Sequence, residues 1–401
     1  MLMPNLNYAQ LKDSYLFAHI SKRIASYLKE HPGTRLLRMG IGDVSLPLCD
    51  EVIRALHSAV EDQAHAETFH GYMPECGAPF LREAIADHYG KRKIQLSPDE
   101  VFVSSGASDE LGDILDLFES RSVVQVLEPA YPAYVDANTM AGRTILHLNS
   151  GEDNGFLPEP DESVRPDLIY LCSPNNPTGA VFNRDQLQRW IDYANAIGAV
   201  LLFDAAYEAF IEDPTCPRSI FELSGARTCA IEICSLSKTA GFTGTRLGYT
   251  VIPRELNRYG MNLNQMWVRN RTTKTNGVSY IIQKGASAVF TERGQQQIQA
   301  NLSYYKENAG ILMKALDELG IRYYGGKNAP YIWLRCPGNK TSWDFFEELL
   351  ENIQVIGTPG AGFGACGEGY FRLSSFASRD DTQEASKRLL AYFSGQTSGA
   401  K

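Results

Sequence analysis

The sequence has no excess of positive charge and no long apolar run. Its 38 Lys and Arg residues are outnumbered by 47 Asp and Glu residues, which gives a net charge of -9 at pH 7. Because phosphate backbones and anionic lipids repel a negative chain, we expect neither nucleic acid nor a membrane as a main partner. No apolar run is long enough to cross a bilayer. The segment Met1–Asn7 lacks the basic and apolar regions of a secretory signal, and this favours a cytoplasmic location.

The cysteines and histidines show no pairing or ligand pattern. Eight cysteines occur without Cys-x-x-Cys spacing, and the nearest pair, Cys229 and Cys234, lies in an apolar run typical of a buried strand. We therefore expect reduced thiols, with neither a disulfide framework nor a zinc site. The seven histidines are not clustered, so no metal site is predicted.

What the chain does contain is a regular alternation of apolar strands and helices. Helical stretches begin near Ala107 and cover Asp185–Ala196, and strand-like runs precede and follow them. This order predicts an α/β fold with a mostly parallel central sheet and helices on both faces. The expected strands cover residues 101–104, 123–127, 144–148, 167–172, 199–203, 230–234 and 248–252.

The pattern changes after residue 280. A long helical stretch at Ser303–Leu319 precedes short strands at 332–334 and 369–373, with a helix at Ser342–Glu351 between them. This predicts a smaller α+β domain. The expected division is a large domain at 41–280, a small domain with an N-terminal arm formed by 1–40 and 281–393, and a disordered, small and polar tail at 394–401.

The segment that points to a reaction is Ser235-Leu-Ser-Lys238, which is followed by Arg246. It comes directly after the apolar run 229–234, so the lysine is expected just beyond a buried strand. A lysine there can form a Schiff base with an aldehyde, while nearby hydroxyl groups and an arginine bind a phosphate. That is the chemistry of pyridoxal phosphate (PLP). A surface lysine in a Gly-rich loop would carry the same short signature.

Two more strand ends carry polar residues of matching chemistry. The strand 167–172 runs into Ser173-Pro-Asn-Asn176-Pro-Thr-Gly179, where Pro and Gly build a rigid turn that presents the Asn176 amide. The strand 199–203 delivers Asp204, with Tyr207 three residues later. Alone, Asp204 would more often cap the next turn. Since open α/β sheets bind ligands at the carboxyl ends of their strands, three such ends together favour one shared site.

The chain resembles the class I and II aminotransferases of PLP fold type I, because it contains three of their motifs in the same order: Ser-Pro-Asn-Asn-Pro-Thr-Gly, Asp-x-x-Tyr and Ser-x-Ser-Lys. The similarity covers nearly the whole chain. Within that family the sequence is most similar to the LL-diaminopimelate aminotransferase subgroup. The runs on which this resemblance rests are Tyr15-Leu-Phe, Gly40-Ile-Gly42-Asp43, Gly71-Tyr72-Met-Pro-Glu75-Cys-Gly77, Glu128-Pro-Ala-Tyr131-Pro-Ala-Tyr134, Asn276-Gly277, Ala329-Pro-Tyr331-Ile-Trp333 and Phe371-Arg372-Leu-Ser-Ser375. Several of them are shared across fold type I, whereas the run from Tyr131 to Tyr134 and the pair Tyr72 and Glu75 point more narrowly to the subgroup.

The resemblance implies PLP as the cofactor and a role for each motif residue. Lys238 would hold the cofactor covalently and then serve as the base for proton transfer. Asp204 would keep the pyridine nitrogen protonated, while Tyr207 and Asn176 would hydrogen-bond the ring oxygen and Tyr131 would stack on the ring.

The phosphate is expected between a loop and an arginine. The loop 105–108 lies between a strand and a helix, where backbone N–H groups can face an anion, although a plain helix cap would look similar. The expected cofactor contacts besides those above are Ser105, Gly106, Ala107, Ser108, Ser235, Ser237, Arg246 and Tyr72.

The resemblance also implies a substrate site that two subunits share. Arg372 would pair with the substrate α-carboxylate, Gly42 would bring a backbone N–H near it, and Tyr15 would cover the pocket. Tyr72, Glu75 and Asn276 would reach the site from the other subunit, which implies a homodimer. The expected substrate contacts are Tyr15, Gly42, Tyr72, Glu75, Tyr131, Asn176, Asn276 and Arg372.

One departure from the subgroup's pattern bears on specificity. The helix-start motif usually ends in lysine, whereas here Ser108 stands at that place, and Gly42-Asp43 is followed by Val44 instead of paired threonines. The distal carboxylate of the substrate is then less well paired. Arg269, Arg271 and Lys274 could compensate, but a solvated loop is the simpler interpretation for each.

Three functions follow from these residues. The leading hypothesis is an aminotransferase that converts tetrahydrodipicolinate and glutamate to LL-diaminopimelate and 2-oxoglutarate, in lysine and peptidoglycan precursor synthesis. The second is a related aminotransferase of alanine, aspartate or an aromatic amino acid, with a C–S β-lyase as a variant. The third is a non-catalytic domain of a transcription regulator, which would need a DNA-binding module that the first 40 residues can hardly hold.

Overall fold

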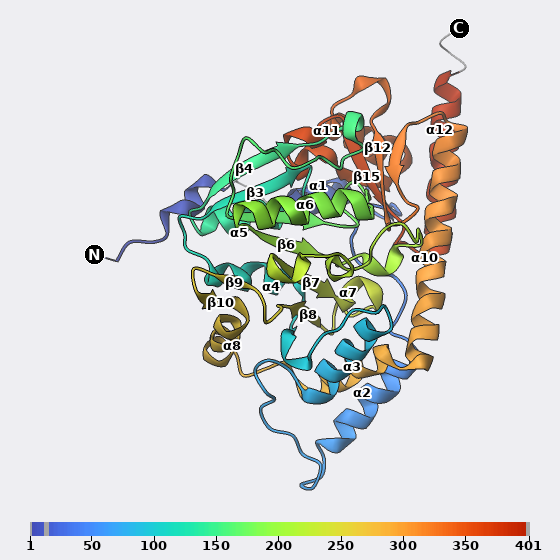
Figure 1. Cartoon of the computed structure of the whole chain (residues 1–401). Coiled ribbons are helices and arrows are strands. Elements are labelled where there is room, and N and C mark those ends of the chain that lie inside the picture. The colour runs from blue at the N-terminus through green and yellow to red at the C-terminus, as the bar shows by residue number, and fades with distance from the viewer. Residues whose placement is uncertain (1, 12–15, 398–401) are drawn as a thin grey trace.

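The computed structural model describes residues 2–11 and 16–397 and contains the predicted central sheet (Figure 1). Seven strands within these residues pair in the order β2-β8-β7-β6-β5-β3-β4. Only β8 runs antiparallel to its neighbours, β2 and β7, so the mostly parallel sheet is confirmed. The strands are β2 Val101–Ser104, β3 Val123–Glu128, β4 Thr144–Asn149, β5 Leu168–Cys172, β6 Val200–Asp204, β7 Ala230–Ser235 and β8 Gly248–Val251.

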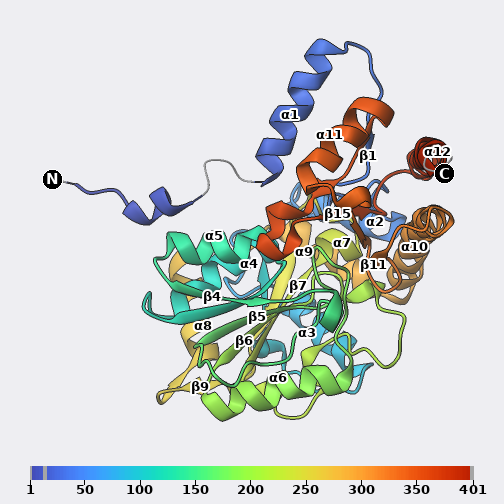
Figure 2. The ribbon, with the colours of Figure 1, turned by 90° about the horizontal axis from the view of Figure 1, so that it is seen from above.

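Helices cover both faces of this sheet, which explains its continuous apolar strands. In β5, Leu168 and Tyr170 pack into one hydrophobic cluster with α4 and α5, whereas Ile169 and Leu171 pack into another with α6. Figure 2 shows α4 and α5 on one side of the strands and α6 on the other. The helices are α2 Asp50–Asp62, α3 Pro79–Gly90, α4 Ala107–Asp113, α5 Pro132–Met140, α6 Arg184–Ile197, α7 Leu236–Thr239, α8 Leu263–Lys274 and α9 Tyr280–Ser287.

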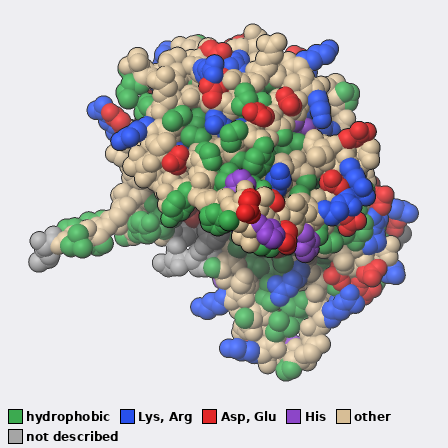
Figure 3. Space-filling view, turned by 90° about the horizontal axis from the view of Figure 1, so that it is seen from below, with side chains coloured by type: hydrophobic (Ala, Val, Ile, Leu, Met, Phe, Trp, Pro, Cys, Tyr) green, Lys and Arg blue, Asp and Glu red, His purple; other side chains and the backbone are tan. Residues whose placement is uncertain are grey.

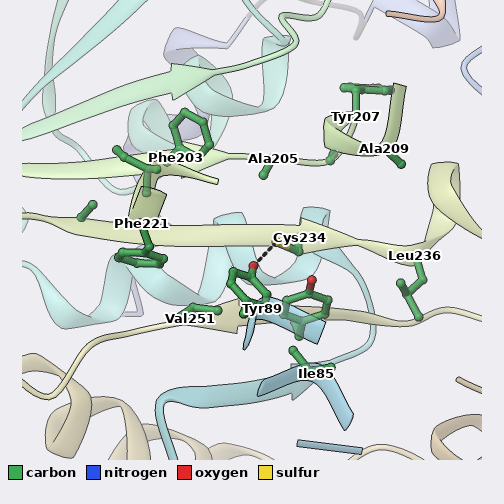
Figure 4. Packing of buried hydrophobic residues seen from close by; sticks show 14 of the residues in the cluster. Ile85, Tyr89, Phe203, Ala205, Tyr207, Ala209, Phe221, Cys234, Leu236 and Val251 are labelled. Carbon is green, nitrogen blue, oxygen red and sulfur yellow. Dashed lines mark hydrogen bonds between the residues drawn. The ribbon is translucent and has the colours of Figure 1, made fainter. Parts of the chain in front are cut away.

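The core beneath β6 and β7 is shown in Figure 4. The hydroxyl group of Tyr89, from α3, lies 3.4 Å from the Cys234 sulfur, and both residues are buried among Phe203, Val251 and Ile85. All eight cysteines of the chain are free thiols. The tight packing fixes the strands whose ends carry Asp204 and Ser235.

A second cluster gathers around a smaller antiparallel sheet in the order β11-β12-β15-β14. Its largest members include Trp333, Phe346 and Phe371. The elements are α1 Leu16–Glu30, β1 Leu37–Arg38, α10 Glu292–Glu318, β11 Tyr323–Gly325, β12 Tyr331–Arg335, α11 Ser342–Ile353, β13 Val355–Ile356, β14 Thr358–Pro359, β15 Tyr370–Ser374 and α12 Arg379–Thr397. The division into domains at 41–280 and at 1–40 with 281–393 stays a prediction.

One predicted element differs at its start. The helix expected at Ser303–Leu319 begins at Glu292, where the Thr291 side chain accepts a hydrogen bond from the Gly294 backbone N–H and caps the helix. Polar residues dominate its first turns, so apolar spacing alone did not reveal them. At the other end of the chain, α12 overlaps the tail expected from residue 394. Residues 398–401 lie outside the described part, and the disorder of this tail stays a prediction.

The surface mixes both signs of charge. On the face in Figure 3, Lys and Arg side chains are interspersed with Asp and Glu. Across the described residues, no helix combines the length and apolarity that a membrane span requires. A short hairpin, β9 Asn257–Arg258 and β10 Met261–Asn262, precedes α8.

Candidate active site

A cavity of about 550 Å³ lies where β5, β6 and β7 end. Open α/β sheets place ligands at this edge. The cavity wall contains three residues that lie at or just after the carboxyl ends of these strands, namely Asn176, Asp204 and Ser235. The predicted site residues that line it are Gly42, Ala107, Ser108, Tyr131, Asn176, Asp204, Tyr207, Ser235, Ser237, Lys238, Arg246 and Arg372.

Lys238 lies in the single turn of α7, directly after β7, and its Nζ donates a hydrogen bond to the backbone carbonyl of Gly42. Burial lowers the pKa of this lysine to about 8, and the positive charges of Arg372 and Arg246 act in the same direction, against Asp43. A much larger fraction of the amine is therefore neutral at physiological pH than in an ordinary lysine. A neutral amine is the form that attacks an aldehyde.

Asp204 ends β6 and is only 5% exposed. Its Oδ2 accepts a hydrogen bond from the Tyr134 hydroxyl (2.6 Å) and its Oδ1 one from the Ala206 backbone N–H (3.0 Å). Burial raises the pKa of this carboxyl, and both donors oppose the rise. No basic side chain of the described residues pairs with it. A protonated pyridine nitrogen would supply the missing positive charge, so the residue fits the expected cofactor.

Arg372 is fully buried in β15, at 1% exposure, without an acidic partner in the described chain. Its Nη1 donates to Asn176 Oδ1 (2.6 Å) and its Nη2 to the Gly40 carbonyl (2.7 Å), while the Tyr331 ring lies 4.2 Å from its Cζ. Its Nε has no hydrogen-bond partner among these residues. A buried guanidinium at a cavity wall suits a substrate carboxylate.

The loop before α4 packs against a cation. Gly106 has φ +137°, and a Cβ there would lie 2.3 Å from Arg246 Nη2, so the guanidinium rests directly on the loop backbone. Arg246 Nη1 also donates to Ser237 Oγ (3.3 Å). On the other side, a Cβ at Gly248 would lie 2.9 Å from the Ala107 nitrogen. Ser235, Ser237 and Arg246 line the cavity next to this loop, and such a set of donors suits a phosphate.

Tyr134 and Tyr331 line the cavity, although the sequence assigned neither of them a role. The hydroxyl groups of Tyr207 and Tyr331 are 2.8 Å apart. Tyr134 lies edge-on to Tyr131, with ring centroids 5.6 Å apart. Both missed residues belong to runs that the sequence singled out, but only the folded chain brings Tyr331 to Tyr207.

Of the predicted residues that the structure describes, five do not line the cavity. Ser105 and Gly106 lie in the loop beside it, whereas Tyr15 falls outside the described residues. Tyr72 is 89% exposed, and Glu75 and Asn276 also lie away from the cavity.

The exposed predicted residues come from two adjoining segments. A Cβ at Gly277 would lie 2.7 Å from the Met73 carbonyl oxygen, which places the neighbours of Tyr72 and Asn276 side by side. Together with Glu75 they form one surface, called here the Tyr72 surface.

The expectation of a solvated loop for the three cations near Asn276 was wrong about the loop, and for Arg271 it was also wrong about solvation, whereas Arg269 and Lys274 are exposed. Arg269, Arg271 and Lys274 lie in helix α8. Arg271 is buried, where it pairs with Glu110 and Asp113, and its guanidinium stacks on Trp267 at 4.3 Å. Lys274 pairs with Asp116. Two of these cations are therefore engaged in ion pairs, which require contacts with α4 and the turn after it that local sequence does not reveal.

Comparisons with known proteins agree with this geometry. The family model "Aminotransferase class I and II" matches residues 34–389. The chain is 49% identical to the LL-diaminopimelate aminotransferase of Lachnospira eligens, over 98% of this chain and 100% of that protein, and 48% identical to that of Agathobacter rectalis with the same coverage. The solved L,L-diaminopimelate aminotransferase of Chlamydomonas reinhardtii superposes with a TM-score of 0.93 at 39% identity, covering 98% and 99% of the two chains. This chain belongs to the class I and II aminotransferase family.

Proposed function

We propose that the chain is an LL-diaminopimelate:2-oxoglutarate aminotransferase that works in the cytoplasm as a homodimer. The observation that carries the proposal is the convergence of Lys238, Asp204 and Arg372 on one cavity. The full-length similarity to LL-diaminopimelate aminotransferases of about 48% identity supports the substrate. In the synthetic direction the reaction takes tetrahydrodipicolinate, glutamate and water to LL-diaminopimelate and 2-oxoglutarate.

Aminotransferases of this family use PLP. When bound, PLP takes up the amino group of the donor and delocalises the electrons of the broken Cα–H bond. Asp204 would hold the pyridine nitrogen and Arg246, Ser235 and Ser237 the phosphate. Each of these groups already faces the cavity without needing a rearrangement of its strand.

The remaining residues would orient the substrate and move its proton. Arg372 would bind the α-carboxylate, since its buried guanidinium has a free Nε. With one carboxylate fixed, the Cα–H bond would lie near Lys238, whose pKa of about 8 makes the neutral amine an effective base near neutral pH. Tyr207 would donate to the cofactor's ring oxygen once its hydroxyl group leaves that of Tyr331.

The homodimer is proposed from the exposure of the Tyr72 surface. Its residues do not line the cavity of their own chain. The same segment exposes the apolar side chain of Phe69 (63%) as well as that of Tyr72. A second copy would cover these apolar side chains and bring Tyr72, Glu75 and Asn276 to its partner's cavity. The carboxylate of Glu75 would then bind the distal ammonium of the substrate.

A related aminotransferase with another amino donor is the second candidate. It is favoured by Ser108, because a serine at the cavity wall leaves the distal carboxylate without a cation there. Arg271 and Lys274 cannot supply one without giving up their acidic partners.

An assay with the purified protein separates the two candidates. LL-diaminopimelate with 2-oxoglutarate should yield glutamate at a kcat/KM well above that for alanine, aspartate or phenylalanine. The matched control is Lys238→Ala, which should abolish turnover of every donor. Turnover of alanine or an aromatic donor without turnover of LL-diaminopimelate would exclude the leading candidate.

A further inference from the structure

We propose that Tyr134 is a positioning residue for the cofactor, which acts through Asp204 by fixing the orientation and the charge of its carboxylate. This inference rests on the proposed binding of the pyridine nitrogen by Asp204, and it is independent of the amino donor. Its basis is the 2.6 Å hydrogen bond from the Tyr134 hydroxyl to Asp204 Oδ2, between two buried side chains at the cavity wall.

Stacking and a shared amide hold the Tyr134 ring in this position. It is stacked on Tyr170, with centroids 4.7 Å apart and an interplanar angle of 21°. One Asn138 Nδ2 donates both to the Tyr134 backbone carbonyl (2.8 Å) and to the Tyr170 hydroxyl (3.1 Å), so the amide joins the two tyrosines. Because α5 begins with Pro132 and its first turn carries Tyr134, the phenol points inward from a rigid element.

The phenol is the only side-chain donor to Asp204 among the described residues. The Ala206 backbone N–H holds the other oxygen, so the two donors together set the plane of the carboxylate. Burial raises the pKa of the Tyr134 phenol well above its ordinary value, and the neighbouring Asp204 charge adds to the rise. The hydroxyl group therefore stays protonated and remains a donor throughout the working pH range.

The same bond keeps the carboxylate ionised. Burial raises the Asp204 pKa, and the Tyr134 hydrogen bond lowers it more than the Ala206 N–H does. The other titratable side chain beside it is the Cys172 thiol of β5, whose pKa is raised by burial and by the Asp204 charge, so it adds no negative charge. Without the phenol, Asp204 would accept a proton at a higher pH and would hold a cationic ring nitrogen less well.

The test is the affinity of the apoprotein for PLP in Tyr134→Phe, measured by absorbance titration from pH 5 to pH 9. Loss of a hydrogen bond to a charged group should weaken binding about 10- to 100-fold. Because loss of this hydrogen bond raises the Asp204 pKa, the acid-side loss of affinity should also move to higher pH. Other titrating groups, including Lys238, are common to both proteins and cancel in the ratio of their affinities.

Tyr170→Phe is the matched control. It removes the same hydroxyl group from the stacked neighbour, which is equally buried and does not line the cavity. We expect this variant to bind PLP as the parent does, with melting temperatures of the two apoproteins alike. Equal weakening in both variants, or no shift of the acid limb in Tyr134→Phe, would overturn the inference.

A double variant shows whether Tyr134 acts through Asp204 or contacts PLP directly. In an Asp204→Asn background, Tyr134→Phe should cause no further loss of affinity, because the charge on which it acts is gone. An undiminished loss in that background contradicts the inference. If Asp204→Asn itself binds PLP normally, the proposed role of Asp204 is wrong, and this outcome is separate from the identity of the amino donor.

Discussion

Burial acts on two facing charges of this cavity in the same way, since it favours the neutral form of each. The pKa of the Lys238 amine falls to about 8, and that of the Asp204 carboxyl rises. The amine becomes a nucleophile near neutral pH, while the charged carboxylate, which already accepts hydrogen bonds from Tyr134 and Ala206, would be stabilised further by a cationic ligand. A nucleophilic amine and a carboxylate that a cation would stabilise both suit one molecule that carries an aldehyde and a basic ring nitrogen.

The first prediction concerns the pH dependence of cofactor uptake. Only the deprotonated amine attacks an aldehyde, and deprotonation is half complete at the pKa and nearly complete about one pH unit above it. The rate constant for covalent PLP uptake by the apoprotein should therefore rise through about pH 8 and level off above it. Stopped-flow absorbance measures this rate, with Lys238→Ala as the protein that shows no covalent phase. A rate that climbs only above pH 10 would mean an unperturbed lysine.

The second prediction concerns Ser108, which lines the cavity in the first turn of α4, at the end of the loop 105–108. A lysine there would pair with the distal carboxylate of a diamino diacid, and one such pair is worth about tenfold in affinity. Ser108→Lys should raise kcat/KM for LL-diaminopimelate relative to alanine by about tenfold. Ser108→Ala is the control and should leave the ratio unchanged. A loss for both donors alike would place Ser108 in cofactor binding alone.

At the scale of elements, the sequence predicted the strands and the polar residues at their ends, because apolar runs and Gly–Pro turns are local signals. It did not reveal the two cations of α8 held by Glu110, Asp113 and Asp116, since those partners lie about 160 residues away in sequence. The sequence also did not reveal that α10 begins at Glu292, and here the reason is local. The first turns of the helix are polar and lack the apolar stripe from which a helix is predicted.

The third prediction concerns the contact between β8 and the loop 105–108, which we propose binds the phosphate and call the phosphate loop. A Cβ at Gly248 would come within 2.9 Å of the Ala107 nitrogen and within 2.8 Å of the Cys234 carbonyl oxygen, both of them backbone atoms that cannot easily give way. Gly248→Ala should therefore weaken PLP binding by tenfold or more and lower the free energy of unfolding by about 1–3 kcal/mol.

Gly244→Ala is the control for this contact. Gly244 lies four residues before Gly248, and a Cβ there meets nothing within 4 Å. Calorimetry and PLP titration of both variants test the idea. Equal behaviour of the two would mean that the close approach of β8 does not shape the phosphate loop.

At the scale of the whole molecule, a single chain accounts for cofactor binding but leaves part of the predicted substrate site on the surface. Sequence resemblance alone assigned Tyr72, Glu75 and Asn276 to the partner subunit, because no local pattern tells which copy a side chain serves. The structure places Tyr72 in solvent at 89% exposure. The predicted domain division and the homodimer both remain proposals.

The fourth prediction tests the shared site by mixing two inactive variants. Lys238→Ala lacks the base and Tyr72→Ala lacks the contribution to the partner, so a mixed dimer would contain one intact site of two. Unfolding and refolding an equal mixture should restore about a quarter of the parent activity, because half of the dimers are mixed. The refolded single variants are the controls. Activity that stays at their level would mean that Tyr72 serves its own chain.

The claim on which all of these predictions depend is that Lys238 carries the cofactor. Reduction of the PLP-loaded protein with borohydride, followed by digestion and mass spectrometry, tests it most directly. We expect one phosphopyridoxyl group per chain, on the peptide that contains Ser235, Ser237 and Lys238. A label on any other lysine, or its persistence in Lys238→Ala, would mean that Lys238 does not carry the cofactor.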